Sequence, residues 1–147
     1  MIAFSTTTAF WLVGRLVMGK GSAGIYLLIY EEGTQFAIEA DLQAEVEVQM
    51  GRPLPIGRVS ELLDVEDGLG VANAGLIRVL RIDRWSPDLV ALLDTHVIRL
   101  ERSGAQFLFL TTLALAEQLL KDAPNFRNRL TEILQIVPDD LSGGGPH

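Results

Sequence analysis

The chain has 147 residues, the usual length of a single domain with one core. It carries 12 Lys and Arg against 19 Asp and Glu, which gives a net charge of -7. An acidic surface repels phosphate backbones and anionic lipid headgroups, which argues against nucleic-acid and membrane partners. There is no cysteine, which excludes disulfides, zinc–thiolate sites and thiol nucleophiles and favours a reducing compartment such as the cytoplasm.

Residues 9 to 30 form the most apolar part of the chain. A membrane-spanning helix needs about 20 consecutive, mostly apolar residues. Here Arg15 and Lys20 bring charge into the stretch, and glycines at positions 19, 21 and 24 interrupt it. No basic residue precedes Phe10, so we expect no signal peptide. The stretch predicts two short buried elements joined by a glycine-rich turn.

The first of these elements is a predicted helix over residues 8 to 18. Its spacing places apolar residues on roughly one helical face, namely Phe10, Leu12, Val13, Leu16 and Val17. The hydroxyl run at residues 5 to 8 has no base beside it, so it is interpreted as the helix start rather than as a nucleophile. Residues 24 to 30 (GIYLLIY) are continuously apolar, which is typical of a strand buried on both faces.

Residues 33 to 50 fit two periodicities. Apolar residues alternate from Phe36 to Met50 as in a strand, but Glu, Gln and Ala dominate the segment, and these favour helices. We predict a helix, because the segment is too long for a strand and a helix must cross back over a parallel sheet. The acidic stretch from 39 to 47 is then interpreted as a solvated helix face, although it would equally suit a basic partner.

The second half of the chain alternates apolar runs with amphipathic segments. A short strand or helical turn is expected at 56 to 63 and a glycine-rich loop at 64 to 75. Further strands are predicted at 75 to 82, 105 to 112 and 129 to 137. One predicted helix begins at Pro87, with Ser86 as its N-cap, and stops at Gly104. Another covers residues 113 to 124 and is ended by Pro124.

Together these elements predict a three-layer α/β fold, with a mainly parallel sheet of about four or five strands flanked by helices. We expect a single domain over residues 1 to 140 and a flexible tail over residues 141 to 147. The sequence shows no internal repeat and no second domain.

Three motifs in the second half resemble an NTPase core of the AAA+ or STAND type. VLRID (79 to 83) is a hydrophobic strand ending in an acid, as in a Walker B motif. FLFLTT (107 to 112) is in the place of the next strand, which ends in a polar sensor residue in those enzymes. The passage APNFRNRLTEILQIVPDD (123 to 140) is similar to their arginine-bearing helix that leads into the last strand.

The first half departs from that family at the phosphate site. A phosphate loop follows the first strand with the pattern G-x-x-x-x-G-K-[ST]. Here residues 31 to 35 (EEGTQ) follow that strand, with two acids and no lysine, and the tempting GKGS at 19 to 22 lies before it. Arg84 stands where the catalytic acid would follow Asp83. The chain therefore resembles small, inactivated STAND-like domains without a P-loop, found in bacterial conflict and signalling systems. The resemblance implies an NTPase-like sheet without hydrolysis.

Two groups of residues are candidates for binding a partner. The first group, Asp83, Arg84, Trp85 and Asp88, follows a strand at the sheet edge where open α/β folds usually bind ligands. Trp85 would be an interface anchor, since tryptophan is enriched at interface hot spots. Alternatively, Trp85 packs against the edge of the sheet and Asp83 caps the turn.

The second group is Arg127 and Arg129. Their guanidinium groups could bind an anion or an acidic group of a partner through forked hydrogen bonds. The alternative is that they form salt bridges with acids on the protein's own surface. In active relatives, the resemblance implies, such arginines meet a neighbour's nucleotide.

These observations predict a non-catalytic interaction domain, an adaptor or scaffold of a bacterial signalling or defence system. Its partner would be another protein, either an effector or a second copy of the chain. No nucleophile–base pair is visible, and neither histidine has a second ligand nearby, so we expect no enzyme, no cofactor and no metal. Two alternatives stay open: a nucleotide-binding switch without hydrolysis, and a structural domain that forms homo-oligomers.

Overall fold

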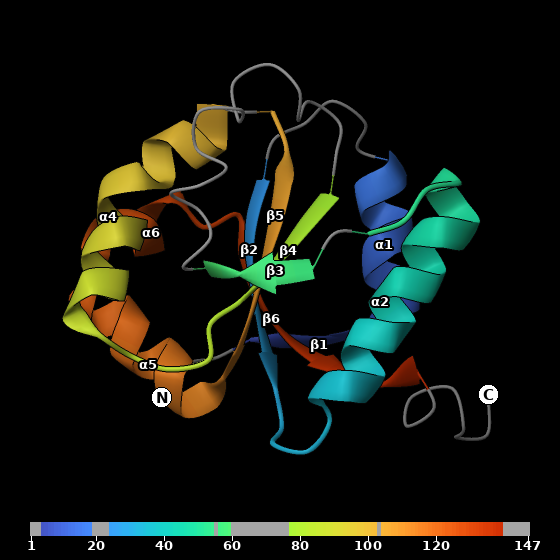
Figure 1. The fold of residues 1–147 in the computed structure, drawn as a ribbon, viewed down its shortest axis with the longest axis horizontal. Coiled ribbons are helices and arrows are strands. Elements are labelled where there is room, and N and C mark those ends of the chain that lie inside the picture. The colour runs from blue at the N-terminus through green and yellow to red at the C-terminus, as the bar shows by residue number, and fades with distance from the viewer. Residues whose placement is uncertain (1–3, 19–23, 55, 60–76, 103, 140–147) are drawn as a thin grey trace.

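The computed structural model describes residues 4–18, 24–54, 56–59, 77–102 and 104–139 (Figure 1). It has the predicted three-layer α/β architecture, with a parallel sheet between two layers of helices, consistent with a P-loop-like core. Within the described ranges the sheet contains six strands, so the prediction of four or five was too low. Every strand pair is parallel.

The sheet brings the ends of distant segments together. Its strands are β1 (Ser5–Thr8), β2 (Gly24–Tyr30), β3 (Ile56–Arg58), β4 (Ile77–Arg81), β5 (Gln106–Thr112) and β6 (Glu132–Val137). They lie in the order β1-β6-β2-β5-β4-β3. Because all are parallel, their carboxyl ends meet at one edge of the sheet, which we call the carboxyl edge.

Helices cover both faces of the sheet (Figure 1). On one face are α1 (Ala9–Met18) and α2 (Gln35–Met50); on the other are α4 (Pro87–Arg102), α5 (Leu113–Asp122) and α6 (Pro124–Arg129). The side chains of β5 show why both faces need a cover. Phe107 and Phe109 point to the α4 side, while Leu108 and Leu110 point to the α1 side. All four are fully buried, as the continuous apolar run predicted.

The hydroxyl run is not the helix start that the sequence indicated. Residues Ser5 to Thr8 form strand β1, which pairs with β6 so that Thr8 lies opposite Val137. Threonine is β-branched and suits a strand once a neighbouring strand offers backbone hydrogen bonds. The helix starts at Ala9. The predicted burial of Phe10 is also wrong, because 53% of this side chain is exposed.

Among the described residues the other predicted elements are confirmed, with shifts at Pro124 and at the last strand, which begins at Glu132 instead of residue 129. The segment at 33 to 50 is helical, and residues 56 to 58 form a short strand. Helix α5 ends at Asp122, and Pro124 starts α6 instead of merely stopping its predecessor. The carboxylate of Asp94 in α4 accepts hydrogen bonds from the backbone N–H groups of Asn125 and Phe126, at 2.7 and 3.1 Å. These bonds satisfy N–H groups that a helix start leaves free.

Three sequence predictions fall on residues outside the described ranges. They are the glycine-rich loop at 64 to 75, the flexible tail at 141 to 147 and the GKGS turn at 19 to 22. Among the helices that the structure describes, none combines the length and the apolar character needed to cross a membrane.

Candidate functional site at the carboxyl edge

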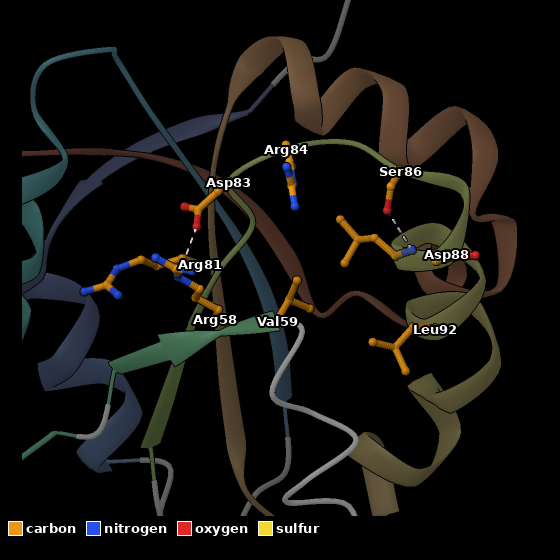
Figure 2. A pocket seen from close by; sticks show the side chains of 9 residues that line it. Arg58, Val59, Arg81, Asp83, Arg84, Ser86, Asp88 and Leu92 are labelled. Carbon is orange, nitrogen blue, oxygen red and sulfur yellow. Dashed lines mark hydrogen bonds and ion pairs between the residues drawn. The ribbon is translucent and has the colours of Figure 1, made fainter.

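A cavity of about 590 Å³ opens at the carboxyl edge, between the ends of β3 and β4 and the beginning of α4 (Figure 2). Its volume is within the range of small-molecule sites. The described residues that line it are Arg58, Val59, Arg81, Asp83, Arg84, Ser86, Asp88, Leu89 and Leu92. The cavity therefore combines apolar walls with several charged groups. Three of the predicted partner-binding residues, Asp83, Arg84 and Asp88, lie here.

The charged groups around the cavity are not equally available. Arg58 and Asp83 form an ion pair at 3.7 Å, with both side chains about half exposed or more. Arg84 projects towards the space between Val59 and the start of α4 (Figure 2). Within the described part of the chain, no acid pairs with its guanidinium group. Arg84 is thus a cation that a ligand can reach.

The start of α4 is fixed by Ser86. Its Oγ accepts a hydrogen bond from the backbone N–H of Leu89 at 3.1 Å, so the predicted N-cap is confirmed (Figure 2). Pro87 occupies the first helical position, where its missing N–H costs nothing. This cap holds Leu89 and Leu92 in place as one wall of the cavity.

Beside the cavity, the end of β2 is occupied by a chain of hydrogen-bonded side chains. Tyr30 donates its hydroxyl proton to Oε1 of Gln35 at 3.1 Å, and Nε2 of Gln35 donates to Oε2 of Glu39 at 2.9 Å. Glu39 accepts two bonds from Arg81, from Nε and from Nη2, each at 2.6 Å. We call these four residues the Tyr30–Arg81 network. It ties α2 to the end of β4.

Strand alternation explains how Arg81 reaches Glu39. In β4, Ile77 and Val79 contact the α1–α2 layer, whereas Leu80 contacts the α4 layer. Arg81 continues the first series and so faces α2. Its partner Glu39 is only 6% exposed, although the sequence indicated a solvated acidic face there. The interpretation of that face was therefore wrong for Glu39.

The surroundings of Glu39 and Tyr30 shift the pKa of each group. The hydrogen bonds from Arg81 hold the pKa of Glu39 below its usual value, against the opposing effect of burial, with help from Gln35. Burial raises the pKa of Tyr30, and the carboxylates of Asp83, Glu39 and Glu32 raise it further while Arg81 opposes them. The negative potential that these acids create at Tyr30 would repel a phosphate group.

The polar side chain of Thr111 near the end of β5 also forms a hydrogen bond within the fold. Thr111 is fully buried, and its hydroxyl donates a hydrogen bond to the carbonyl oxygen of Ile82 at 3.2 Å. In the NTPases that the sequence resembles, the corresponding strand ends in a polar sensor residue. The hydroxyl of Thr111 instead holds the turn after β4 against β5.

The structure separates the two predicted partner-binding groups. Trp85 lies in the turn before α4 with 42% of its side chain exposed. Arg129 pairs with Glu101 at 2.8 Å, as the salt-bridge alternative expected, and Arg127 is on the same short helix α6. Asp88 and Glu101 lie near opposite ends of the 16-residue helix α4, which is about 24 Å long at 1.5 Å per residue. The two groups therefore belong to separate surfaces.

Arg58, Arg81 and Glu39 are the site residues that sequence reasoning missed. Arg81 ends an apolar strand, which was a usable signal for a group at the carboxyl edge. Glu39 gave no such signal, because its partner is far away in sequence and only the fold brings them together.

Within the described ranges, no three His, Asp or Glu side chains are grouped so that they could hold a metal ion. No protein-family model matches the chain. The search of curated proteins found no match for it either.

Proposed function

We propose that this chain is a non-catalytic protein-interaction domain, an adaptor or scaffold acting in the cytoplasm as part of a bacterial signalling or defence system. The observation that carries the proposal is a set of large apolar side chains that are exposed on α1 and α2. We call it the α1–α2 face and define it by five exposed side chains: Phe10, Trp11, Met18, Phe36 and Val48.

Helix α1 contributes the aromatic part of this surface. Trp11 is 65% exposed and packs edge-to-face against Phe10, with 5.3 Å between the ring centroids. Met18 lies two turns further along the same side and is 88% exposed. A paired, solvent-facing tryptophan and phenylalanine are unusual on a surface that meets only water, and tryptophan is the residue most enriched at binding hot spots.

Helix α2 extends the surface with an apolar stripe. Phe36 and Val48 stand near its two ends with 89% and 81% of their side chains exposed. Exposed alanines at positions 37, 40 and 44 lie between them at helical spacing. Since α1 and α2 rest side by side on the same face of the sheet, their outer sides point away from the same layer (Figure 1).

The proposal that the domain does not hydrolyse nucleotides is supported by the Tyr30–Arg81 network. It fills the region after β2 where a phosphate loop would lie in the NTPases that the sequence resembles. The acids Glu31 and Glu32 follow β2 directly, and no lysine is present there. The resemblance to inactivated STAND-like domains is the basis for the bacterial signalling or defence system.

The test compares two matched substitutions. Trp11→Lys places a charge on the α1–α2 face, and Ile98→Lys places the same charge on α4, where the replaced side chain is 39% exposed. Tagged proteins are isolated from cells of the native host after cross-linking, and the co-purifying proteins are quantified. We expect a partner with the wild type and the Ile98 variant, and a loss of about 30-fold or more with Trp11→Lys, as for a hot-spot tryptophan.

Two results would contradict the proposal. One is a set of co-purifying proteins that Trp11→Lys leaves unchanged although both variants melt at the wild-type temperature. The other is hydrolysis of ATP or GTP by the purified chain. Light scattering over a concentration series identifies the homo-oligomer alternative, because a wild-type oligomer that Trp11→Lys converts to a monomer means that the partner is a second copy.

A further inference from the structure

We propose that the cavity at the end of β3 and β4 binds a small organic monocarboxylate with an aliphatic body. The carboxylate would pair with Arg84, and the aliphatic body would lie against Val59, Leu89 and Leu92. This site is on the α4 side of the sheet, so it is separate from the α1–α2 face and goes beyond the proposed function.

The apolar walls of the cavity are the reason for proposing a ligand with an aliphatic body. Val59 is buried, and Leu89 and Leu92 are partly buried against the core on the α4 side. They present apolar surface to a volume of about 590 Å³. Apolar walls with a few polar groups are typical of small-molecule sites. Aliphatic groups match such walls because they bury apolar area without a polar atom that would need a partner.

The charged side chains that line the cavity favour a ligand with a single negative charge. Arg81 is held by Glu39 on the other side of the sheet, and Arg58 is paired with Asp83. This leaves Arg84 as the cation of the cavity that no acid of the described chain neutralises. A carboxylate carries one charge and matches the fork of one guanidinium group. A phosphate dianion would bring a second charge close to Asp83 and Asp88, which would repel it.

A set of three ligands tests both parts of the proposal. 4-Methylpentanoate has the carboxylate and the branched body; 4-methylpentanamide lacks the charge, and acetate lacks the body. Each is titrated into the ¹⁵N-labelled protein while the backbone amide resonances are followed. We expect saturable shifts at Ser86, Leu89 and Leu92 with 4-methylpentanoate, and a dissociation constant of about 1 mM for a ligand of this size. The amide and acetate should each bind at least about tenfold more weakly.

Matched arginine variants test the contact with Arg84. Arg84→Gln removes the charge from the cavity, and Arg52→Gln removes the same charge from an exposed position outside the cavity lining. We expect Arg84→Gln to raise the dissociation constant of 4-methylpentanoate at least about tenfold. Arg52→Gln should leave this dissociation constant unchanged. Both side chains are exposed and lack an ion-pair partner in the described chain, so both variants should melt like the wild type.

The proposal fails if the amide binds as tightly as the carboxylate, or if Arg84→Gln binds as tightly as the wild type. It also fails if no saturable shift appears at Ser86, Leu89 or Leu92 up to about 20 mM ligand. An equal loss in Arg52→Gln would overturn it too, because the effect would then follow net charge and not the cavity. None of these outcomes depends on the protein partner of the α1–α2 face.

Discussion

Replacing Arg81 by Met should destabilise the fold mainly by leaving the carboxylate of Glu39 buried without its cation. Glu39 has a side chain only 8% exposed, and it accepts two hydrogen bonds of 2.6 Å from Arg81. Breaking a fully buried pair costs about 3–5 kcal/mol, because one charge stays behind uncompensated. Since the Arg81 side chain is 31% exposed and so partly solvated, we expect a smaller cost than for a fully buried pair, about 2–3 kcal/mol at pH 7.

A double-mutant cycle isolates the pair from the other contacts that Arg81 makes. The four proteins are the wild type, Arg81→Met, Glu39→Gln and the double variant. Their unfolding in urea is followed by circular dichroism at pH 7. In the double variant no buried charge remains, so the coupling energy between the two positions should be about 2 kcal/mol in favour of the native pair.

The pH dependence gives a second readout of the same pair. The pKa of Glu39 is lowered in the folded protein, chiefly by the hydrogen bonds from Arg81. A lowered folded pKa means that the unfolded chain binds more protons, so this stability is present above about pH 4.3 and fades as the pH falls through the folded pKa. In Arg81→Met the largest lowering cause is gone and burial remains, so Glu39 takes up its proton more readily.

We therefore expect the difference in the free energy of unfolding between the wild type and Arg81→Met to become smaller as the pH is lowered from 7 to 4. Glu39→Gln carries no carboxylate at this position and serves as the control for titration of the other acids. A coupling energy below about 0.5 kcal/mol would refute the reasoning. The reasoning would also be refuted if Arg81→Met lost the same free energy of unfolding at pH 7 and at pH 4.

Four further predictions concern the cap of α6, the Arg129–Glu101 pair, nucleotide binding and Trp85. Asp94→Ala removes the acceptor for the first N–H groups of α6, including that of Phe126, and should lower the free energy of unfolding by about 1 kcal/mol in urea titrations; a loss below the experimental error would contradict the capping role. Arg129→Ala should cost less than about 1 kcal/mol in the same assay, because its pair with Glu101 is solvent-exposed on both sides, and a larger loss would mean that Arg129 supports the core. ATP or GTP with Mg²⁺ should leave the melting temperature unchanged over a ligand concentration series, and a dose-dependent rise would favour the nucleotide-switch alternative. Trp85→Ala should weaken partner binding by about 2 kcal/mol if Trp85 is an interface anchor, measured per folded molecule; a loss of folding with unchanged binding would assign Trp85 to packing instead.

Much of the fold could be predicted because its signals are local. The apolar runs at 24 to 30 and 105 to 112 are continuous, and this pattern arises when a strand is covered on both faces. Ser86 and Pro87 together mark a helix start, because a hydroxyl acceptor and a fixed φ angle act within one turn of chain. Helix α2 was predicted against its own strand-like alternation by its length and composition.

The errors occurred where a distant segment decides the outcome. Residues 5 to 8 carry hydroxyl side chains that fit a helix start, but β6 offers them a backbone ladder and they become an edge strand. Phe10 was grouped with Leu12 and Leu16, yet the packing of α1 against the core buries those two side chains and leaves Phe10 53% exposed. Pro124 was expected only to end a helix, and Asp94 on another helix makes it the beginning of the next.

By itself, the sequence determined the class of fold, the absence of the phosphate-loop pattern after the strand at 24 to 30, and the presence of charged groups after β4. Periodicity, composition and motif spacing are properties of neighbouring residues, so they can be recognised without the fold. Only the tertiary structure decided that Glu39 is buried against Arg81, that Arg84 points towards the cavity, and that large apolar side chains of α1 and α2 stay exposed. These features depend on which segments the parallel sheet places side by side, and that arrangement is fixed by packing between residues far apart in the chain.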